Sequence, residues 1–128
     1  MTDRNPILVV EDDPDGQAVV RHILEYHRWP VVVASNGERA SDYLFQQQIH
    51  FSAAIVDLAL PGMDGWQLLA AIRQNPATAS LLCVAVTAFH SSKTRAAAIK
   101  AGFDAYIPKP VDSTGFIRTI DSLLSERD

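Results

Sequence analysis

The chain has 128 residues, of which 48% are hydrophobic, a size and composition typical of one compact domain. It carries 15 acidic and 11 basic residues, so its formal net charge is −4. This balance argues against nucleic acid as the main partner and against a basic membrane-docking face. No apolar run approaches the ~20 residues of a membrane span. The one cysteine, Cys83, lies in an apolar run and suits a reducing compartment. We therefore expect a cytoplasmic protein with no nucleic-acid or membrane partner.

Five short apolar runs alternate with longer amphipathic segments. The runs are continuous rather than alternating, which is typical of strands covered on both faces. The predicted strands span residues 7–10, 31–34, 53–56, 81–86 and 105–107. Right-handed crossovers between parallel strands place helices on both faces of the sheet. The predicted fold is therefore a doubly wound α/β domain. With the common strand order 2-1-3-4-5, it is a flavodoxin-like five-stranded parallel sheet.

The segments between the runs carry helix signals. Asp13 and Pro14 form a cap and first-turn pair, and Asn36 and Asp64 precede the second and third helices. The fourth helix is expected to begin at Ser91 or Ser92 and to end at Gly102. The positions expected to face inward are Val20, Ile23, Leu24 and His27; Ala40, Tyr43 and Leu44; Leu68, Leu69 and Ile72; and Phe116, Ile117, Ile120, Leu123 and Leu124.

The fourth predicted helix has few apolar side chains. Its stretch from Arg95 to Lys100 offers Ile99 as the one sizeable anchor. A helix with little buried area is easily shifted. Two interpretations remain open here, a small-residue interface and a mobile element.

Polar residues stand at the expected carboxyl ends of four strands, where open α/β sheets bind ligands. They are Glu11, Asp12 and Asp13, then Asp57, then Thr87, then Lys109. In the order 2-1-3-4-5 the sheet reverses between strands one and three. Glu11, Asp12 and Asp57 therefore share one crevice. Asp13 is interpreted as the helix cap.

Three carboxylates in one crevice repel each other by ~1–4 kcal/mol per pair at about 4 Å. Mg²⁺, a hard cation with oxygen ligands, would relieve this repulsion. Lys109 adds a second positive charge and Thr87 a hydrogen-bond donor, a set that suits phosphoryl transfer. Asp57 is the best nucleophile candidate because it ends a central apolar strand.

Four motifs of this sequence together resemble the receiver domains of two-component response regulators. The resemblance covers essentially the whole chain, and the motifs occur in the family's order and with family-like separations. They are Ile7-Leu8-Val9-Val10-Glu11-Asp12-Asp13, Ile55-Val56-Asp57-Leu58-Ala59-Leu60-Pro61-Gly62-Met63-Asp64-Gly65, Val86-Thr87-Ala88 and Tyr106-Ile107-Pro108-Lys109-Pro110.

The resemblance implies that a histidine kinase or histidine phosphotransfer protein phosphorylates Asp57. It also implies a Mg²⁺ site made by Glu11, Asp12, Asp57 and the backbone carbonyl of Ala59. Such a domain has no independent metabolic activity. Mg²⁺-dependent self-phosphorylation from small phosphodonors and slow autodephosphorylation are expected.

Further roles follow from the same resemblance. Thr87 and Tyr106 match the switch residues, which reorient when the phosphoryl group draws the threonine hydroxyl inward. Lys109 matches the lysine that contacts the phosphoryl group, and the Lys109–Pro110 bond is expected to be cis. Phe89 stands at a position that tunes water access to the acyl phosphate, and its bulk predicts a comparatively shielded site.

Three alternative functions fit this sequence less well. A haloacid-dehalogenase-type phosphatase carries a second aspartate where this chain has Ala59. A calcium loop beginning at Glu11 would have His22 at its twelfth place instead of glutamate. A pseudo-receiver that only binds partners usually lacks one or more site residues, and this chain keeps them all.

The expected protein is a single receiver domain over residues 1–128 with no output domain. Its signalling then runs through contacts with a downstream protein that the sequence does not identify. In the family, the face formed by the fourth helix, the fifth strand and the fifth helix carries the response. A monomer or a weak homodimer is expected.

Overall fold

The computed structural model describes residues 4–125. Residues 1–3 and 126–128 of the predicted domain lie outside the described residues. Strands and helices alternate along the chain, and one short segment, η1, is π-helical. The elements are β1 (Ile7–Val10), α1 (Pro14–Tyr26), β2 (Val31–Ala34), α2 (Gly37–Ser41), η1 (Asp42–Gln46), β3 (Ala53–Asp57), α3 (Gly65–Gln74), β4 (Leu82–Thr87), α4 (Ser92–Ala101), β5 (Ala105–Pro108) and α5 (Ser113–Ser125).

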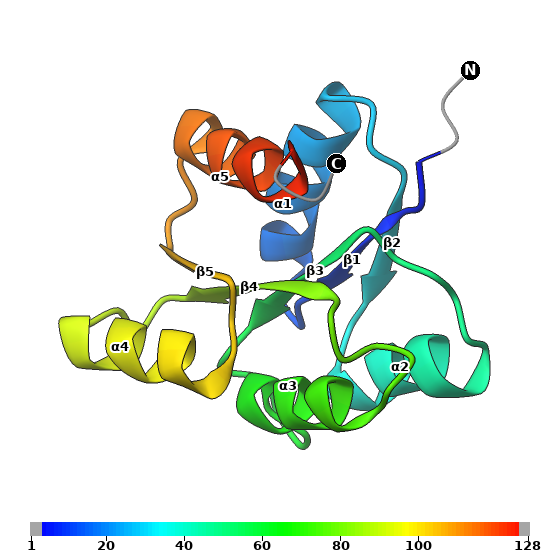
Figure 1. Ribbon diagram of the computed structural model, residues 1–128. Helices are drawn as coiled ribbons and strands as arrows, with labels where there is room; N and C mark the ends of the chain where they lie inside the picture. Colours follow the sequence, from blue (N-terminus) through cyan, green and yellow to red (C-terminus); the bar gives the residue numbers. More distant parts are fainter. Residues whose placement is uncertain (1–3, 126–128) are drawn as a thin grey trace.

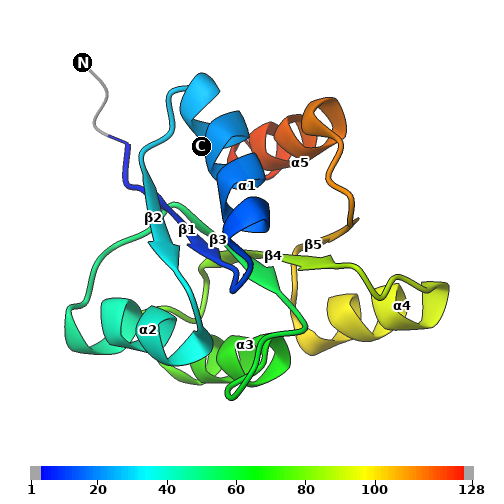
Figure 2. The same ribbon diagram turned by 180° about the vertical axis from the view of Figure 1, so that it is seen from behind.

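The strands form one parallel sheet in the order β2-β1-β3-β4-β5. Helices α1 and α5 cover one face of this sheet, and α2, α3 and α4 cover the other (Figures 1 and 2). The strand order reverses between β1 and β3, which pair in a register that sets Val10 opposite Val56. The predicted fold class and strand order are confirmed.

Alternate residues of each strand enter two separate hydrophobic cores. Along β1, Ile7 and Val9 belong to the core beneath α1 and α5, whereas Leu8 and Val10 belong to the core beneath the other helices. All four side chains are at most 1% exposed. Each such burial contributes roughly 1.5–3 kcal/mol, so continuous apolar strands are what a sheet covered on both faces requires.

The predicted helix caps are present. The side chains of Asp13, Asn36, Asp64 and Ser91 each accept a hydrogen bond from a backbone N–H in the first turn of their helix. Asp64 also forms a reciprocal capping box with Gln67. Gly102 ends α4 with φ of 120°, in the left-handed region that glycine adopts readily.

Two predictions about buried side chains are wrong, the inward position of His27 and the role of Ile99 as the anchor of the fourth helix. His27 is exposed because α1 ends at Tyr26, so His27 already belongs to the turn that follows. Ile99 is 49% exposed, and the buried residue of α4 is Ala98. The single sizeable apolar side chain of α4 is therefore about half exposed, and the fully buried side chain of this helix is the methyl group of Ala98.

Most other inward positions are as predicted. Of the predicted inward positions other than His27, most are buried, and the others are partly buried against the same two cores. The partly buried ones are Tyr43, Ile117, Leu123 and Leu124. Within residues 4–125, no helix is both long and apolar enough to cross a membrane.

Candidate functional site

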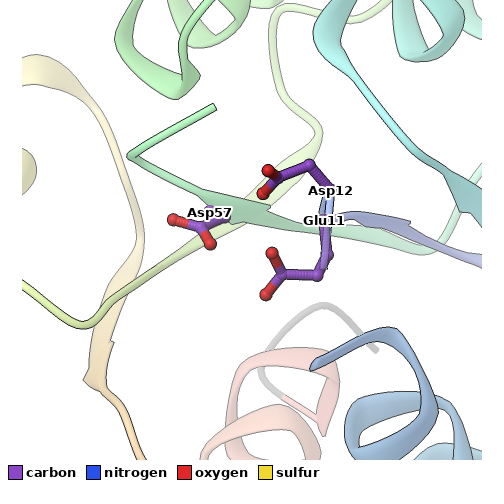
Figure 3. A group of neighbouring side chains, drawn as sticks. All are labelled: Glu11, Asp12 and Asp57. Carbon is purple, nitrogen blue, oxygen red and sulfur yellow. The ribbon is translucent and has the colours of Figure 1, made fainter. Parts of the chain in front are cut away.

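The carboxyl ends of β1 and β3 bring three carboxylates together. Glu11 and Asp12 directly follow β1, and Asp57 is the last residue of β3. One oxygen of each carboxylate lies within 4.8 Å of the others. Figure 3 shows the three side chains converging at this edge, with Glu11 on the side of the sheet that faces α1. The predicted acidic crevice is thus present in the structure.

Burial differs sharply among these carboxylates. Glu11 is 4% exposed and Asp57 is 6% exposed, whereas Asp12 is exposed. A buried carboxylate needs a charged or hydrogen-bonding partner to offset its desolvation. Glu11 and Asp57 both have such partners. These are the side chain of Lys109, next to β5, and backbone N–H groups of the neighbouring loops.

Lys109, directly after β5, supplies the positive charge of the site. Its Nζ donates to Asp57 Oδ2 at 2.8 Å and to Glu11 Oε1. Its backbone N–H donates to the carbonyl oxygen of Thr87 at 2.8 Å, which ties the residue to the end of β4. The Lys109–Pro110 peptide bond is cis. One ammonium group therefore bridges two carboxylates that come from different strands.

The electrostatics show a site with more negative than positive charge. Burial raises the pKa of Glu11, and the nearby Asp57 carboxylate adds to this rise, although Lys109 opposes it. Burial by itself lowers the pKa of Lys109, but its hydrogen bonds with Asp57 and Glu11 outweigh that effect and the pKa is raised. Lys109 is therefore held firmly in its charged form, and the carboxylates can accommodate a further cation.

The loop after β3 shapes the other side of Asp57. The backbone N–H of Ala59 donates to Asp57 Oδ1 at 2.9 Å, so both carboxylate oxygens are held in place. Gly65 lies so close that a Cβ there would come within 2.5 Å of the Asp57 carbonyl oxygen and 2.8 Å of Leu58 Cα. A side chain at position 65 would collide with backbone, which explains why glycine begins α3.

Thr87 ends β4 and is 1% exposed. Its Oγ1 accepts a hydrogen bond from the Phe89 backbone N–H at 3.0 Å. The Phe89 side chain is 73% exposed. The Phe89 side chain therefore does not pack in the core, and any shielding of the site by it depends on its bulk alone.

Tyr106 is 5% exposed and joins the core beneath α2, α3 and α4. Its hydroxyl group lies 3.1 Å from His90 Nδ1, and the Arg95 guanidinium lies 4.8 Å from the centre of its ring. Sequence reasoning missed both neighbours, because neither residue type carries a motif at these positions. They connect Tyr106 to the loop before α4 and to α4 itself.

The donor set of the crevice fits Mg²⁺. Mg²⁺ prefers a few carboxylate oxygens and retains several waters. Glu11, Asp12 and Asp57 offer such oxygens from three adjoining positions, and one of them lies at the exposed rim. Alternative metals that need sulfur or imidazole ligands do not match this set.

The calcium-loop alternative is excluded by the local structure. Residues 14–26 form α1, so the segment after Glu11 is a helix and not a twelve-residue loop. Asp13 caps that helix through the Gly16 N–H, the role expected of it.

Comparison with known proteins gives the family. The model of the family described as "Response regulator receiver domain" matches residues 7–121 of the chain. The chain is 37% identical over 114 residues to the "Uncharacterized 14.6 kDa protein in sodA1 3'region" of Leptolyngbya boryana, which covers 89% of this chain and 86% of that protein.

Two further relatives agree. The chain is 30% identical over 120 residues to the transcriptional regulatory protein CpxR of Escherichia coli, covering 94% of this chain and 49% of CpxR, so it spans about half of that relative. A response regulator receiver domain protein (CheY-like) from Methanospirillum hungatei has a TM-score of 0.84 at 28% identity, with 97% of this chain and 96% of that one covered. The chain belongs to the response regulator receiver family of two-component signalling.

Proposed function

We propose that Asp57 accepts a phosphoryl group from a phosphohistidine of a histidine kinase or phosphotransfer protein, with Mg²⁺, and that the phosphorylated chain signals through protein contacts. The arrangement around Asp57 is the observation that carries the proposal. This carboxylate is 6% exposed, its two oxygens are oriented by Lys109 and the Ala59 N–H, and two further carboxylates stand beside it. A carboxylate held in this way is suited to act as a nucleophile.

The transfer is balanced as a displacement at phosphorus. A carboxylate oxygen of Asp57 forms the new bond to phosphorus, and the bond from phosphorus to the donor's imidazole nitrogen breaks. The imidazole keeps the electron pair and gains a proton from water. Because such transfers depend on positioning and charge neutralisation, the fixed orientation of the acceptor is the main contribution of this chain.

The neighbouring residues have separate roles in this proposal. Lys109 Nζ, now 2.8 Å from Asp57 Oδ2, moves to a phosphoryl oxygen once the carboxylate is phosphorylated. Glu11, Asp12, Asp57 and the Ala59 carbonyl are the groups that would hold the metal. When bound, Mg²⁺ neutralises charge on the phosphoryl oxygens and orients them.

The signal is proposed to pass from Thr87 to Tyr106. If the Thr87 hydroxyl turns to donate to a phosphoryl oxygen, space opens beside Thr87, and the Tyr106 ring, already buried, can move toward it. That movement would break the contact with His90 Nδ1, now 3.1 Å, and the ring contact with Arg95. The face of α4, β5 and α5 is then the output surface, and phosphorylation shifts a pre-existing equilibrium of that face.

The partner assignments belong to this proposal. The upstream partner is a histidine kinase or histidine phosphotransfer protein in the same cytoplasmic compartment. The downstream partner is a protein, and the chain is a monomer or a weak homodimer. CpxR is a transcriptional regulatory protein of about twice this length, so its output is not transferred to this chain.

The test is intact-protein mass spectrometry after incubation with acetyl phosphate, with and without Mg²⁺. We expect one Mg²⁺-dependent phosphoryl adduct on the unchanged chain and none on Asp57→Asn. Asp13→Asn is the matched control, since Asp13 is a neighbouring carboxylate that caps α1. The Asp13→Asn chain should still be phosphorylated at Asp57. An unchanged, folded chain that gains no adduct would refute the proposal.

A further inference from the structure

Gly16 stands at an unexpected place in α1. It is the third residue of that helix, where glycine costs roughly 0.5–1 kcal/mol relative to alanine. Its φ is not in the left-handed region, so the backbone conformation does not require glycine. Its backbone N–H donates to the Asp13 cap at 3.2 Å, a bond that any residue except proline could make. The reason for glycine must therefore lie in the space around it.

That space is filled by Glu11. A Cβ at position 16 would lie 2.6 Å from Glu11 Oε1, 3.0 Å from its Cδ and 3.2 Å from its Cγ. The three nearest atoms all belong to the outer half of one side chain. An ordinary contact for a Cβ begins at about 3.4 Å. A side chain at position 16 would thus press on the carboxylate itself.

The Glu11 carboxylate has little freedom to move away. It is 4% exposed, Oε1 accepts from Lys109 Nζ, and Oε2 accepts from the Asp13 backbone N–H at 3.3 Å. The Glu11 backbone is held as well, because Gln17 Nε2 donates to its carbonyl oxygen at 2.7 Å. Displacement of the carboxylate would cost one or more of these hydrogen bonds.

Movement of α1 would cost more free energy than displacement of the Glu11 carboxylate. Val20, Ile23 and Leu24 of α1 are at most 8% exposed and lie in the core shared with α5. A shift of α1 large enough to relieve the contact would disturb this packing. The carboxylate is consequently the part that moves.

We propose that Gly16 is a positioning residue for Glu11, because its missing side chain provides the space in which this long carboxylate bonds Lys109 and faces the metal site beside Asp57. The part of this inference that concerns Mg²⁺ rests on the proposed function. Its specific consequence is a pairwise dependence: glutamate at position 11 requires glycine at position 16, whereas aspartate, one methylene shorter, does not.

The test is a double-mutant cycle of Gly16→Ala and Glu11→Asp on the unphosphorylated chain. Mg²⁺ affinity is measured by isothermal titration calorimetry, without phosphodonor. Gly16→Ala should weaken Mg²⁺ binding by about 10-fold to 100-fold, the usual effect of disturbing the support of a metal ligand. In the Glu11→Asp background the same alanine should change the affinity by no more than about twofold.

Gly115→Ala is the matched control. Gly115 is also the third residue of its helix, α5, and its N–H also donates to the preceding aspartate, Asp112, at 3.0 Å. A Cβ at position 115 would lie 3.0 Å from Asp112 Oδ2, but Asp112 is exposed and its side chain can shift by a few tenths of an ångström. Alanine there should therefore leave Mg²⁺ affinity unchanged and raise the melting temperature slightly, as helix propensity predicts.

Melting temperatures of the four chains of the cycle, without metal, give a second measurement. We expect Gly16→Ala to stabilise the Glu11→Asp chain, as Gly115→Ala stabilises the unchanged chain, and to give no such gain where Glu11 is retained. Additive melting temperatures together with an unchanged Mg²⁺ affinity would overturn the inference. A wild-type chain that binds no Mg²⁺ would refute the proposed function instead, and the metal-free cycle would still decide whether Gly16 accommodates Glu11.

Discussion

The guanidinium group of Arg73 in α3 donates to the carbonyl oxygen of Gly102, from Nη2 at 2.7 Å and from Nε at 3.3 Å. It also donates to the Leu81 carbonyl oxygen at 2.6 Å and to Asp104 Oδ2 at 3.1 Å. Asp104 Oδ2 in turn accepts from the Cys83 backbone N–H at 2.8 Å. One side chain therefore joins the C-terminal end of α4 to the beginnings of β4 and β5.

Replacement of Arg73 should destabilise the domain. We expect Arg73→Lys to lower the free energy of unfolding by about 2 kcal/mol and Arg73→Ala by about 3 kcal/mol, because a lysine cannot reproduce the planar fork of donors. Urea denaturation measures both. Arg21→Lys, which alters an exposed ion pair with Glu25, should change it by less than about 0.5 kcal/mol. Equal effects at the two positions would contradict this prediction.

Helix α4 should be the least protected of the long helices. Its buried residue is Ala98, whereas α3 buries Leu68, Leu69 and Ile72. We expect amide hydrogens of α4 to exchange with solvent earlier than those of α3 in native-state hydrogen exchange. With beryllofluoride as a phosphoryl mimic, the exchange of α4 should change and that of α3 should not. Identical exchange of α4 with and without the mimic would count against the proposed switch.

Alanine at position 65 should be strongly destabilising. Its Cβ would lie within 2.8 Å of Leu58 Cα, and backbone atoms cannot move aside as a flexible side chain can. We expect Gly65→Ala to lower the free energy of unfolding by about 2 kcal/mol or more. Gly115→Ala, in an exposed first turn where the one tight contact is with the exposed Asp112 side chain, should change it by no more than about 0.5 kcal/mol. If Gly65→Ala and Gly115→Ala shift the denaturation midpoint by the same amount, the contact between position 65 and the Leu58 backbone does not require glycine.

The metal-free protein should lose stability in strong alkali through Lys109. Its pKa is raised in the folded chain above the ordinary value of 10.5, so the folded state holds this proton more tightly than the unfolded state. The resulting stabilisation is fully present below pH 10.5 and disappears as the pH rises through the folded pKa. We expect the free energy of unfolding to fall more steeply there for the unchanged chain than for Lys109→Gln, measured by denaturation with a chelator. Parallel curves for the two chains would exclude this linkage.

Phe89→Ala should shorten the life of the acyl phosphate. The Phe89 backbone N–H is bonded to Thr87 Oγ1, and Phe89 is 73% exposed. Removal of this large side chain next to Thr87 in the chain should give water easier access. We expect a severalfold faster loss of the phosphoryl adduct in a time course followed by mass spectrometry. Ile99→Ala removes another exposed apolar side chain, in the last turn of α4, and should leave the rate unchanged. An unaltered rate for Phe89→Ala would remove the shielding hypothesis.

Local chemistry allowed much of the fold to be predicted. The caps at Asp13, Asn36 and Asp64 depend on a side chain and a backbone N–H within the same turn, and each was found where expected. Continuous apolar strands and polar strand ends likewise reflect burial along a few consecutive residues, and these patterns also led to Asp57, Glu11 and Asp12. The prediction for His27 was wrong because periodicity does not show where a helix ends. The prediction for Ile99 was wrong because the size of an apolar side chain does not show which face of a short, polar helix meets the sheet.

The sequence by itself determined the alternation of strands and helices, the acidic residues at the strand ends and the family, since these follow from apolar runs, residue types at strand ends and motif spacing. Only the tertiary structure decided which atoms meet: Lys109 with two carboxylates, Arg73 with Gly102, and Glu11 with the empty space at Gly16. These contacts join residues on separate elements. Their distances depend on how strands and helices pack, and no local pattern of side chains encodes that packing.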